Sequence, residues 1–179
     1  MPAVRRLLLV PILALAAVPL AACSSSSSSS STGGDATGST TGSGGTGGSV
    51  PAVANATNLH VAPVIGAGTP PAPTTLVTKD LVVGTGTTAT SSNTVVVQYV
   101  GADYANGKVF DSSWSRGQAA TFPLNGVIPG FAQGIVGMKV GGRREIVIPA
   151  SLGYGAAGSP PAVGPNETLV FVVDLTALQ

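Results

Sequence analysis

The chain of 179 residues is long enough for one domain of ordinary size or for two small ones. Only 8% of the residues are charged and the formal net charge is +1, so neither nucleic acid nor an acidic partner is expected to bind by electrostatic attraction. One Cys and one His exclude a disulfide framework and a Cys/His zinc site within the chain, and they argue against a Cys-His nucleophilic pair.

Residues 1–22 have the features of a secretory signal peptide. Arg5 and Arg6 precede an apolar run that is shorter than the ~20 residues needed to span a bilayer. The run ends in Leu-Ala-Ala-Cys, which resembles the lipobox of bacterial lipoproteins, in which the Cys is diacylated and becomes the new N-terminus. We therefore expect export, by the Sec or the twin-arginine route, and anchoring through a lipid on Cys23 to the outer face of the bacterial cell membrane. An ordinary cleavage site that happens to precede a Cys is the alternative.

Two segments of unusual composition follow the signal. Residues 23–49 begin with the lipidated Cys and continue with Ser, Gly and Thr almost throughout, so they predict a flexible tether with nothing to bury. Residues 50–75 are rich in Pro, Ala and Val and predict an extended segment that lies along the domain or stays free. The alternative for this segment is that residues 59–65 form an extra strand.

Residues 76–179 are expected to form the folded domain. A domain of about 100 residues can bury a little over 60% of its unfolded surface, which is enough for one modest core. β-branched or alternating apolar runs predict strands over 94–100, 144–148 and 168–175, and a weaker strand over 76–83.

The rest of the domain is expected to hold one helix, a turn and a long loop. Residues 105–108 predict a hairpin turn, and only residues 130–138 have apolar spacing that fits a helix. Residues 151–165, with their Gly, Pro and Tyr, predict a long loop before the last strand. The fold class is therefore α+β, with an antiparallel sheet and one short α-helix.

Six motifs recur in this domain in one order: Tyr99-Val100-Gly101, Gly107-Lys108-Val109-Phe110-Asp111-Ser112-Ser113, Val127-Ile128-Pro129-Gly130-Phe131, Gly137-Met138-Lys139-Val140-Gly141, Tyr154-Gly155 and Thr168-Leu169-Val170-Phe171. Together they closely resemble the FKBP-type peptidyl-prolyl cis-trans isomerases, the macrolide-binding immunophilins. The resemblance covers nearly all of residues 76–178. It implies a twisted antiparallel half-barrel wrapped around the helix, with a pocket between helix and sheet.

Carried over position by position, the resemblance places the substrate-binding pocket on Tyr99, Phe110, Asp111, Arg116, Phe122, Val127, Ile128, Phe131, Tyr154, Val163 and Phe171. It implies that the backbone N–H of Ile128 and the hydroxyl of Tyr154 donate to ligand carbonyls. Asp111 would lie near the rotating carbonyl and hold Tyr99 and Arg116 in place. The expected catalytic residues are therefore Asp111, Tyr99, Ile128 and Tyr154.

Four positions depart from the family pattern. The pocket base is Phe131 rather than Trp, and Ala120 replaces an aromatic residue. Gly126 stands where a Glu often precedes Val-Ile, and Ser159 stands where some relatives have His. These departures bear on macrolide affinity and on the residue preferred before proline, and they leave Tyr99 and Asp111 in place.

The strand containing Phe110 and Asp111 requires an irregularity. Strict alternation directs neighbouring side chains to opposite faces, so the two residues can share a pocket only at a bulge or at a strand end. The alternative role for Asp111 is to cap a turn with Ser112 and Ser113.

An apolar pocket is suited to proline isomerisation because the twisted amide has lost its resonance and part of its carbonyl dipole. The reaction needs no nucleophile, metal or cofactor, and the sequence offers no convincing set for one. The expected partners are proline-containing polypeptides, macrolide-type inhibitors and, through the lipid, a membrane; the protein is expected to be a monomer. A non-catalytic lipid-tethered chaperone or peptide-binding module is the alternative, and a carrier of small ligands is a third.

Overall fold

The structure is a computed structural model and describes residues 49–179. The predicted signal peptide, the predicted lipobox with Cys23 and the predicted tether up to residue 48 lie outside the described residues. None of the helices in the described part is long and apolar enough to cross a membrane.

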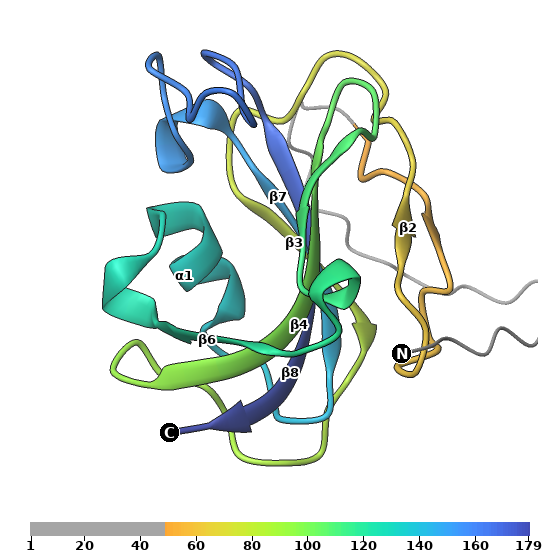
Figure 1. The fold of residues 1–179 in the computed structure, drawn as a ribbon, viewed down its shortest axis with the longest axis vertical. Coiled ribbons are helices and arrows are strands. Elements are labelled where there is room, and N and C mark those ends of the chain that lie inside the picture. The colour runs from red at the N-terminus through yellow and green to blue at the C-terminus, as the bar shows by residue number, and fades with distance from the viewer. Residues whose placement is uncertain (1–48) are drawn as a thin grey trace, which may run out of the picture. The chain divides into compact units, whose positions relative to one another are not determined.

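The domain is built on one antiparallel sheet with the strand order β3-β7-β8-β4-β5, in which β6 also pairs with β4. These strands are β3 (Val77–Val82), β4 (Thr94–Asp103), β5 (Val109–Ser112), β6 (Ala120–Pro123), β7 (Arg143–Ile148) and β8 (Leu169–Leu178). The helices are α1 (Pro129–Ile135) and the 3-10 turns η1 (Trp114–Arg116), η2 (Leu124–Gly126) and η3 (Ala150–Leu152). Figure 1 shows the twisted sheet curving past α1, which confirms the predicted α+β class.

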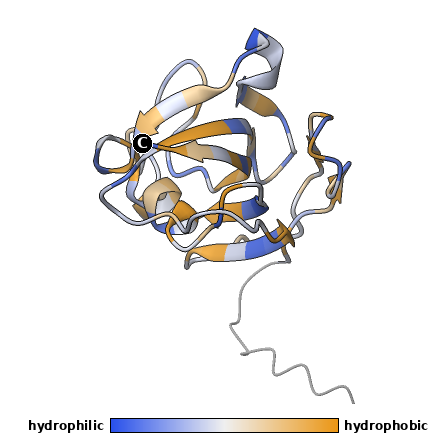
Figure 2. Cartoon of the chain, turned by 90° about the horizontal axis from the view of Figure 1, so that it is seen from below, coloured by the Kyte–Doolittle hydropathy of each residue, from blue (hydrophilic) through white to orange (hydrophobic). Residues whose placement is uncertain are grey.

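The two faces of the sheet bury two separate hydrophobic clusters. On the face toward α1, alternate residues of β8 (Leu169, Phe171, Val173 and Leu175) join the larger cluster, as their period of two predicts. The intervening residues Val170 and Val172 pack on the outer face in the second cluster. Figure 2 shows the hydrophobic residues concentrated in the strands. Burial of both faces explains why β8 begins with a continuous apolar run, from Leu169 to Val173.

Helix α1 approaches β7 so closely that two of its residues must lack a side chain. A Cβ at Gly130 would lie 2.3 Å from Cγ2 of Ile148, and a Cβ at Gly134 would lie 2.5 Å from Cγ2 of Ile146. The helix ends at Ile135, three residues earlier than the spacing predicts, because Gly137 adopts a positive φ of 85°. Packing rather than helix propensity therefore holds α1 in place.

Residues 49–75, here called the strap, lie against the outer face of the sheet. Within the strap, β1 (Val53–Ala54) pairs with β2 (Val64–Ile65) and with no strand of the main sheet. Ile65 is buried in the second cluster. The hydroxyl of Tyr104 lies 2.9 and 2.8 Å from the carbonyl oxygens of Ser49 and Thr69, which share its one proton. The strap thus covers apolar surface that the sheet would otherwise expose.

Charged residues are buried beneath the strap. Arg143 on β7 forms an ion pair with Asp174 on β8, and its guanidinium donates to the carbonyls of Asn55 at 2.6 Å and Val61 at 3.2 Å. Glu145, two residues along β7 on the same face, is 1% exposed, and neither of its carboxylate oxygens has a hydrogen-bond partner in the described part of the chain. Burial raises the pKa of Glu145 to about 7.

Candidate active site

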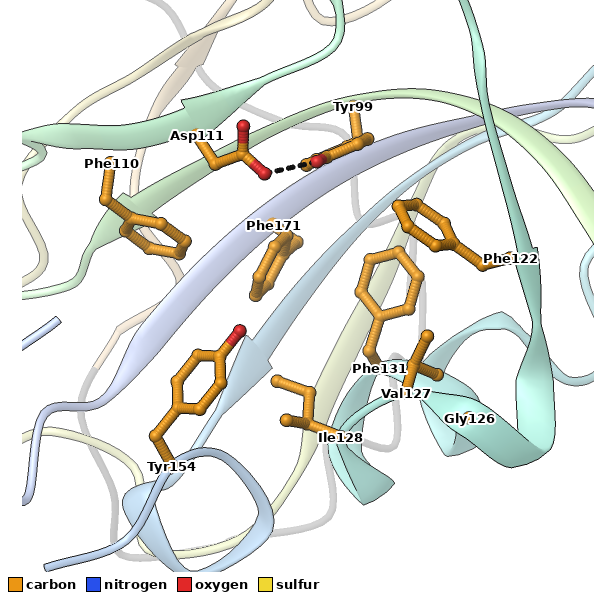
Figure 3. Close-up of a pocket in the computed structure, with 10 residues that line it drawn as sticks. All are labelled: Tyr99, Phe110, Asp111, Phe122, Gly126, Val127, Ile128, Phe131, Tyr154 and Phe171. Atoms are coloured by element: carbon orange, nitrogen blue, oxygen red, sulfur yellow. Dashed lines mark hydrogen bonds between the residues drawn. The ribbon is translucent and has the colours of Figure 1, made fainter. Parts of the chain in front are cut away.

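A cavity of about 320 Å³ opens between α1 and the concave face of the sheet. Its walls are formed by Tyr99, Phe110, Asp111, Phe122, Gly126, Val127, Ile128, Phe131, Tyr154 and Phe171. The lining residues come from β4, β5, β6 and β8, from η2 and the start of α1, and from the loop after η3. Figure 3 shows their side chains directed toward one another. Segments far apart in the sequence therefore build one site.

Aromatic rings packed edge to face form the walls. The ring of Phe131 on α1 lies 5.1 Å from that of Phe171 on β8, and Phe110 on β5 lies 5.6 Å from Phe171. Tyr99 on β4 lies 5.8 Å from Phe122 on β6. Rings at these distances and angles attract one another beyond the area that they bury. The cavity therefore has stiff, apolar walls.

A β-bulge brings Phe110 and Asp111 into the same cavity. In the β4–β5 ladder Gly101 is opposite Asp111 and Ala102 is opposite Val109, so Phe110 is an extra residue without a partner. The sequence had required such an irregularity. Gly101 also makes room for the rings, since a Cβ there would lie 2.8 Å from Phe171 and 2.9 Å from Phe110.

Tyr99, Asp111 and Arg116 form a polar cluster on one wall. The Tyr99 hydroxyl donates to one oxygen of the Asp111 carboxylate, and Arg116 forms an ion pair with the other oxygen. Arg116 also donates to the Tyr99 hydroxyl at 2.9 Å and lies 5.6 Å from the centre of the Tyr99 ring. The negative charge of Asp111 in the cavity wall is thus balanced by Arg116, which lies outside the cavity.

The same contacts set the protonation of the cluster. Burial, followed by the hydrogen bond to Asp111, raises the pKa of Tyr99 to about 12. Partial burial would raise the pKa of Asp111, but hydrogen bonds from Tyr99 and Arg116 and the charge of Arg116 outweigh it, so that pKa is lowered. At neutral pH the site therefore holds a neutral phenol and an ionised carboxylate.

The opposite wall offers hydrogen-bond donors. Ile128 has an extended backbone because Pro129 follows it, and its carbonyl accepts from Phe131 and Ala132 at the start of α1. No hydrogen bond within the described residues uses the N–H of Ile128. Tyr154 is 38% exposed, and Figure 3 shows its hydroxyl directed toward the cavity. Both groups are placed to bind a carbonyl oxygen of a ligand.

The structure brings nine of the eleven sequence-predicted pocket residues to the cavity wall and places the other two elsewhere. Arg116 lies behind Asp111 and reaches the site only through its contacts with Asp111 and Tyr99. Val163 is 3% exposed and packs in the main core cluster. Gly126 lines the cavity with backbone alone, and its place directly before Val127 was the sequence signal for it. Within residues 49–179 no group of three His, Cys, Asp or Glu residues is arranged to hold a metal ion.

Comparison with known proteins gives matches over this same domain. The sequence profile of the FKBP-type peptidyl-prolyl cis-trans isomerase family matches residues 85–176. The chain is 51% identical over 105 residues to a probable FK506-binding protein of Corynebacterium glutamicum, a match that covers 59% of this chain and 88% of the relative. It is 48% identical over 114 residues to an FK506-binding protein of Streptomyces anulatus, covering 62% of this chain and 90% of the relative.

Solved structures share the fold. The crystal structure of FkpA from Escherichia coli matches with a TM-score of 0.55 and 44% identity, over 58% of this chain and 48% of that protein. The crystal structure of AtFKBP13 matches with a TM-score of 0.55 and 35% identity, over 60% of this chain and 95% of that protein. The chain therefore belongs to the FKBP-type peptidyl-prolyl cis-trans isomerase family, and its activity is that of a peptidyl-prolyl cis-trans isomerase.

Proposed function

We propose that the protein isomerises X-Pro bonds of exported polypeptides by binding the twisted amide in the aromatic cavity, without a covalent intermediate. The observation that carries this proposal is the pairing of stiff apolar walls with hydrogen-bond donors at one side and a charge-balanced carboxylate at the other. Family membership supports the reaction class.

The energetic requirement is modest. Resonance of the planar amide imposes a rotation barrier of about 18–20 kcal/mol. A rate increase of about 10⁴-fold corresponds to about 5.5 kcal/mol of transition-state stabilisation. The twisted amide has a smaller carbonyl dipole than the planar one, so it loses less hydration when it enters the cavity beside Phe131 and Phe171. Desolvation and a few hydrogen bonds made in the transition state account for an effect of this size.

Each polar group has a distinct task in this mechanism. The N–H of Ile128 and the hydroxyl of Tyr154 hold carbonyl oxygens of the polypeptide on either side of the proline. Asp111 lies beside the rotating carbonyl group, where its negative charge stabilises the electron-poor carbon of the twisted amide. Arg116 keeps the net charge of this wall at zero. Tyr99 fixes the carboxylate in that orientation. No group needs to gain or lose a proton.

The proposed place of action is the outer face of the cell membrane, with the protein as a lipid-anchored monomer. The support is the sequence Leu20-Ala21-Ala22-Cys23 followed by a Ser, Gly and Thr tether. A diacylglyceryl group on Cys23 supplies two acyl chains, which suffice for stable membrane residence where a single chain would not. Replacing Cys23 with Ser and fractionating the cells tests this. A variant that stays membrane-bound with unchanged mass would refute the lipid anchor.

The catalytic proposal is tested by a protease-coupled assay on short X-Pro peptides. An isomerase accelerates the slow phase of cleavage in proportion to its concentration, whereas a peptide-binding module or chaperone leaves that phase unchanged. The Phe131→Ala variant serves as the matched comparison because it removes one wall of the cavity. An unaccelerated slow phase together with saturable peptide binding would favour the non-catalytic alternative.

A further inference from the structure

The edge of β4 that faces β5 and β6 has a gap at the level of the active site. Residues Thr94–Val97 pair with β6, and residues Val100–Ala102 pair with β5. Between these two stretches lie Gln98 and Tyr99, which pair with no strand at that edge. The chain between β5 and β6 leaves the sheet at this gap and carries η1, including Arg116.

Ser113 fills the gap with hydrogen bonds and is fully buried. Its backbone N–H donates to the carbonyl of Tyr99 at 3.0 Å, and its hydroxyl oxygen accepts from the N–H of Tyr99 at 2.8 Å. The hydroxyl donates in turn to the side-chain carbonyl of Gln98. The side chain thus takes the place that a strand carbonyl would have in a regular ladder. Tyr99 keeps both backbone hydrogen bonds although the neighbouring chain turns away.

We propose that Ser113 is a positioning residue for the isomerase reaction, and that its hydroxyl fixes the geometry of Tyr99, Asp111 and Arg116. Ser113 lies two residues after Asp111 and three residues before Arg116, and it is bonded to the backbone of Tyr99. The Ser113 residue is therefore bonded to one member of the polar cluster and lies between the other two along the chain. The proposal rests on the role given above to Asp111 and Tyr99.

A second serine in the same turn separates this role from a general effect of the turn. The hydroxyl of Ser115 donates to the carbonyl of Ser112 at 2.8 Å, and the residue is exposed. Ser115 makes no hydrogen bond to Tyr99, Asp111 or Arg116 within the described residues. Ser113→Ala and Ser115→Ala are thus chemically identical changes, and only the first removes a contact with the cluster.

The test compares the two variants in kinetics and in the titration of Asp111. Ser113→Ala should lower kcat/KM roughly tenfold per folded molecule, with the loss mainly in kcat, because the phenylalanine rings that bind the substrate are untouched. The pKa of Asp111, followed by carboxyl carbon NMR, should rise toward its ordinary value as Tyr99 and Arg116 lose their alignment. Ser115→Ala should leave both quantities as in the unmodified protein. Unchanged kcat/KM and an unchanged Asp111 pKa in Ser113→Ala would overturn the proposal.

Gln98→Leu carries the test if Ser113→Ala does not fold. It removes the acceptor that orients the Ser113 hydroxyl and leaves the serine itself in place. A several-fold loss of kcat/KM with a raised Asp111 pKa supports positioning, and the absence of both changes refutes it. If the unmodified protein does not accelerate isomerisation at all, the proposed function fails. The NMR titration still decides whether Ser113 orders the cluster.

Discussion

Asp111 is the one charged residue among those that line the cavity, and Arg116 balances its charge. Asp111→Ala should lower kcat/KM roughly tenfold, or ~1.4 kcal/mol, because the stabilisation is made only in the transition state. The melting temperature should hardly change, since the side chain is 41% exposed. Asp80→Ala is the matched control because Asp80 is 43% exposed and pairs with Arg144 away from the cavity. An early melt with unchanged turnover per folded molecule would make Asp111 a structural cap.

The pH dependence of activity follows from the same cluster. The pKa of Tyr99 is about 12 and that of Asp111 is lowered, so neither group changes its protonation near neutral pH. We expect kcat/KM to be flat from about pH 6 to pH 9, and to fall only in acid below the ordinary range of an Asp carboxyl. Exchange NMR on an X-Pro peptide measures this without a coupling protease. A bell-shaped profile centred near neutral pH would contradict a mechanism without proton transfer.

At the scale of single residues, the family resemblance implied the aromatic walls, and the alternation of strand residues required a bulge or a strand end at Phe110 and Asp111. Phe110 and Asp111 could be assigned to one cavity because adjacent strand residues reach the same side only through an irregularity. Val163 was expected in the pocket; it is buried in the cluster that also contains Phe131 and Phe171, and it is not among the residues that line the cavity. From the sequence Ser113 was considered only as part of a turn. Its hydrogen bonds to Tyr99 depend on the gap along β4, between the stretch that pairs with β6 and the stretch that pairs with β5.

At the scale of elements, the contact between α1 and β7 depends on glycine. Gly134→Ala should destabilise the fold by about 1–3 kcal/mol, because the new methyl group overlaps Ile146, and this outweighs the better helix propensity of Ala. The helix would shift and move Phe131 in the cavity floor, so activity should fall as well. Chemical denaturation and the peptide assay measure the two effects. Gln133→Ala, on the exposed side of α1, should have neither, and a stabilised Gly134→Ala protein would contradict the close approach.

The strands were predictable, whereas the sequence left open whether residues 50–75 lie along the domain, for a physical reason. Strands such as β4 and β8 bury apolar side chains on one face or on both, so their sequences show alternating or continuous apolar residues. Polar contacts of the strap are made by its backbone carbonyls, those of Asn55 and Val61 on Arg143 and those of Ser49 and Thr69 on Tyr104. Backbone groups are the same at every position, so they leave no pattern in the sequence.

At the scale of the whole molecule, Glu145 should make folding stability depend on pH. Its pKa is about 7 in the folded protein and 4.5 for an ordinary Glu, so the folded state binds the proton more tightly. Stability should therefore decrease as pH rises from about 4.5 through about 7, by an amount on the order of 3 kcal/mol. Glu145→Gln should remove this slope and be more stable than the unmodified protein at pH 8, measured by denaturant unfolding at several pH values. Glu167→Gln is the control and should keep the pH dependence of the unfolding free energy. If this dependence were the same in both variants, Glu145 would not be its source.

The strap also bears on the solubility of shortened proteins. A chain that begins near Pro73 lacks the segment that covers Val100, Val147 and Val172 on the outer face of the sheet. The cavity lies on the other face, so such a protein should still isomerise peptides at low concentration. At higher concentration the bare apolar face should drive reversible self-association, since exposed patches of this kind favour contact between copies. Sedimentation velocity over a range of concentrations would measure this self-association. The strap therefore protects the apolar outer face of the sheet from contact with other copies of the chain.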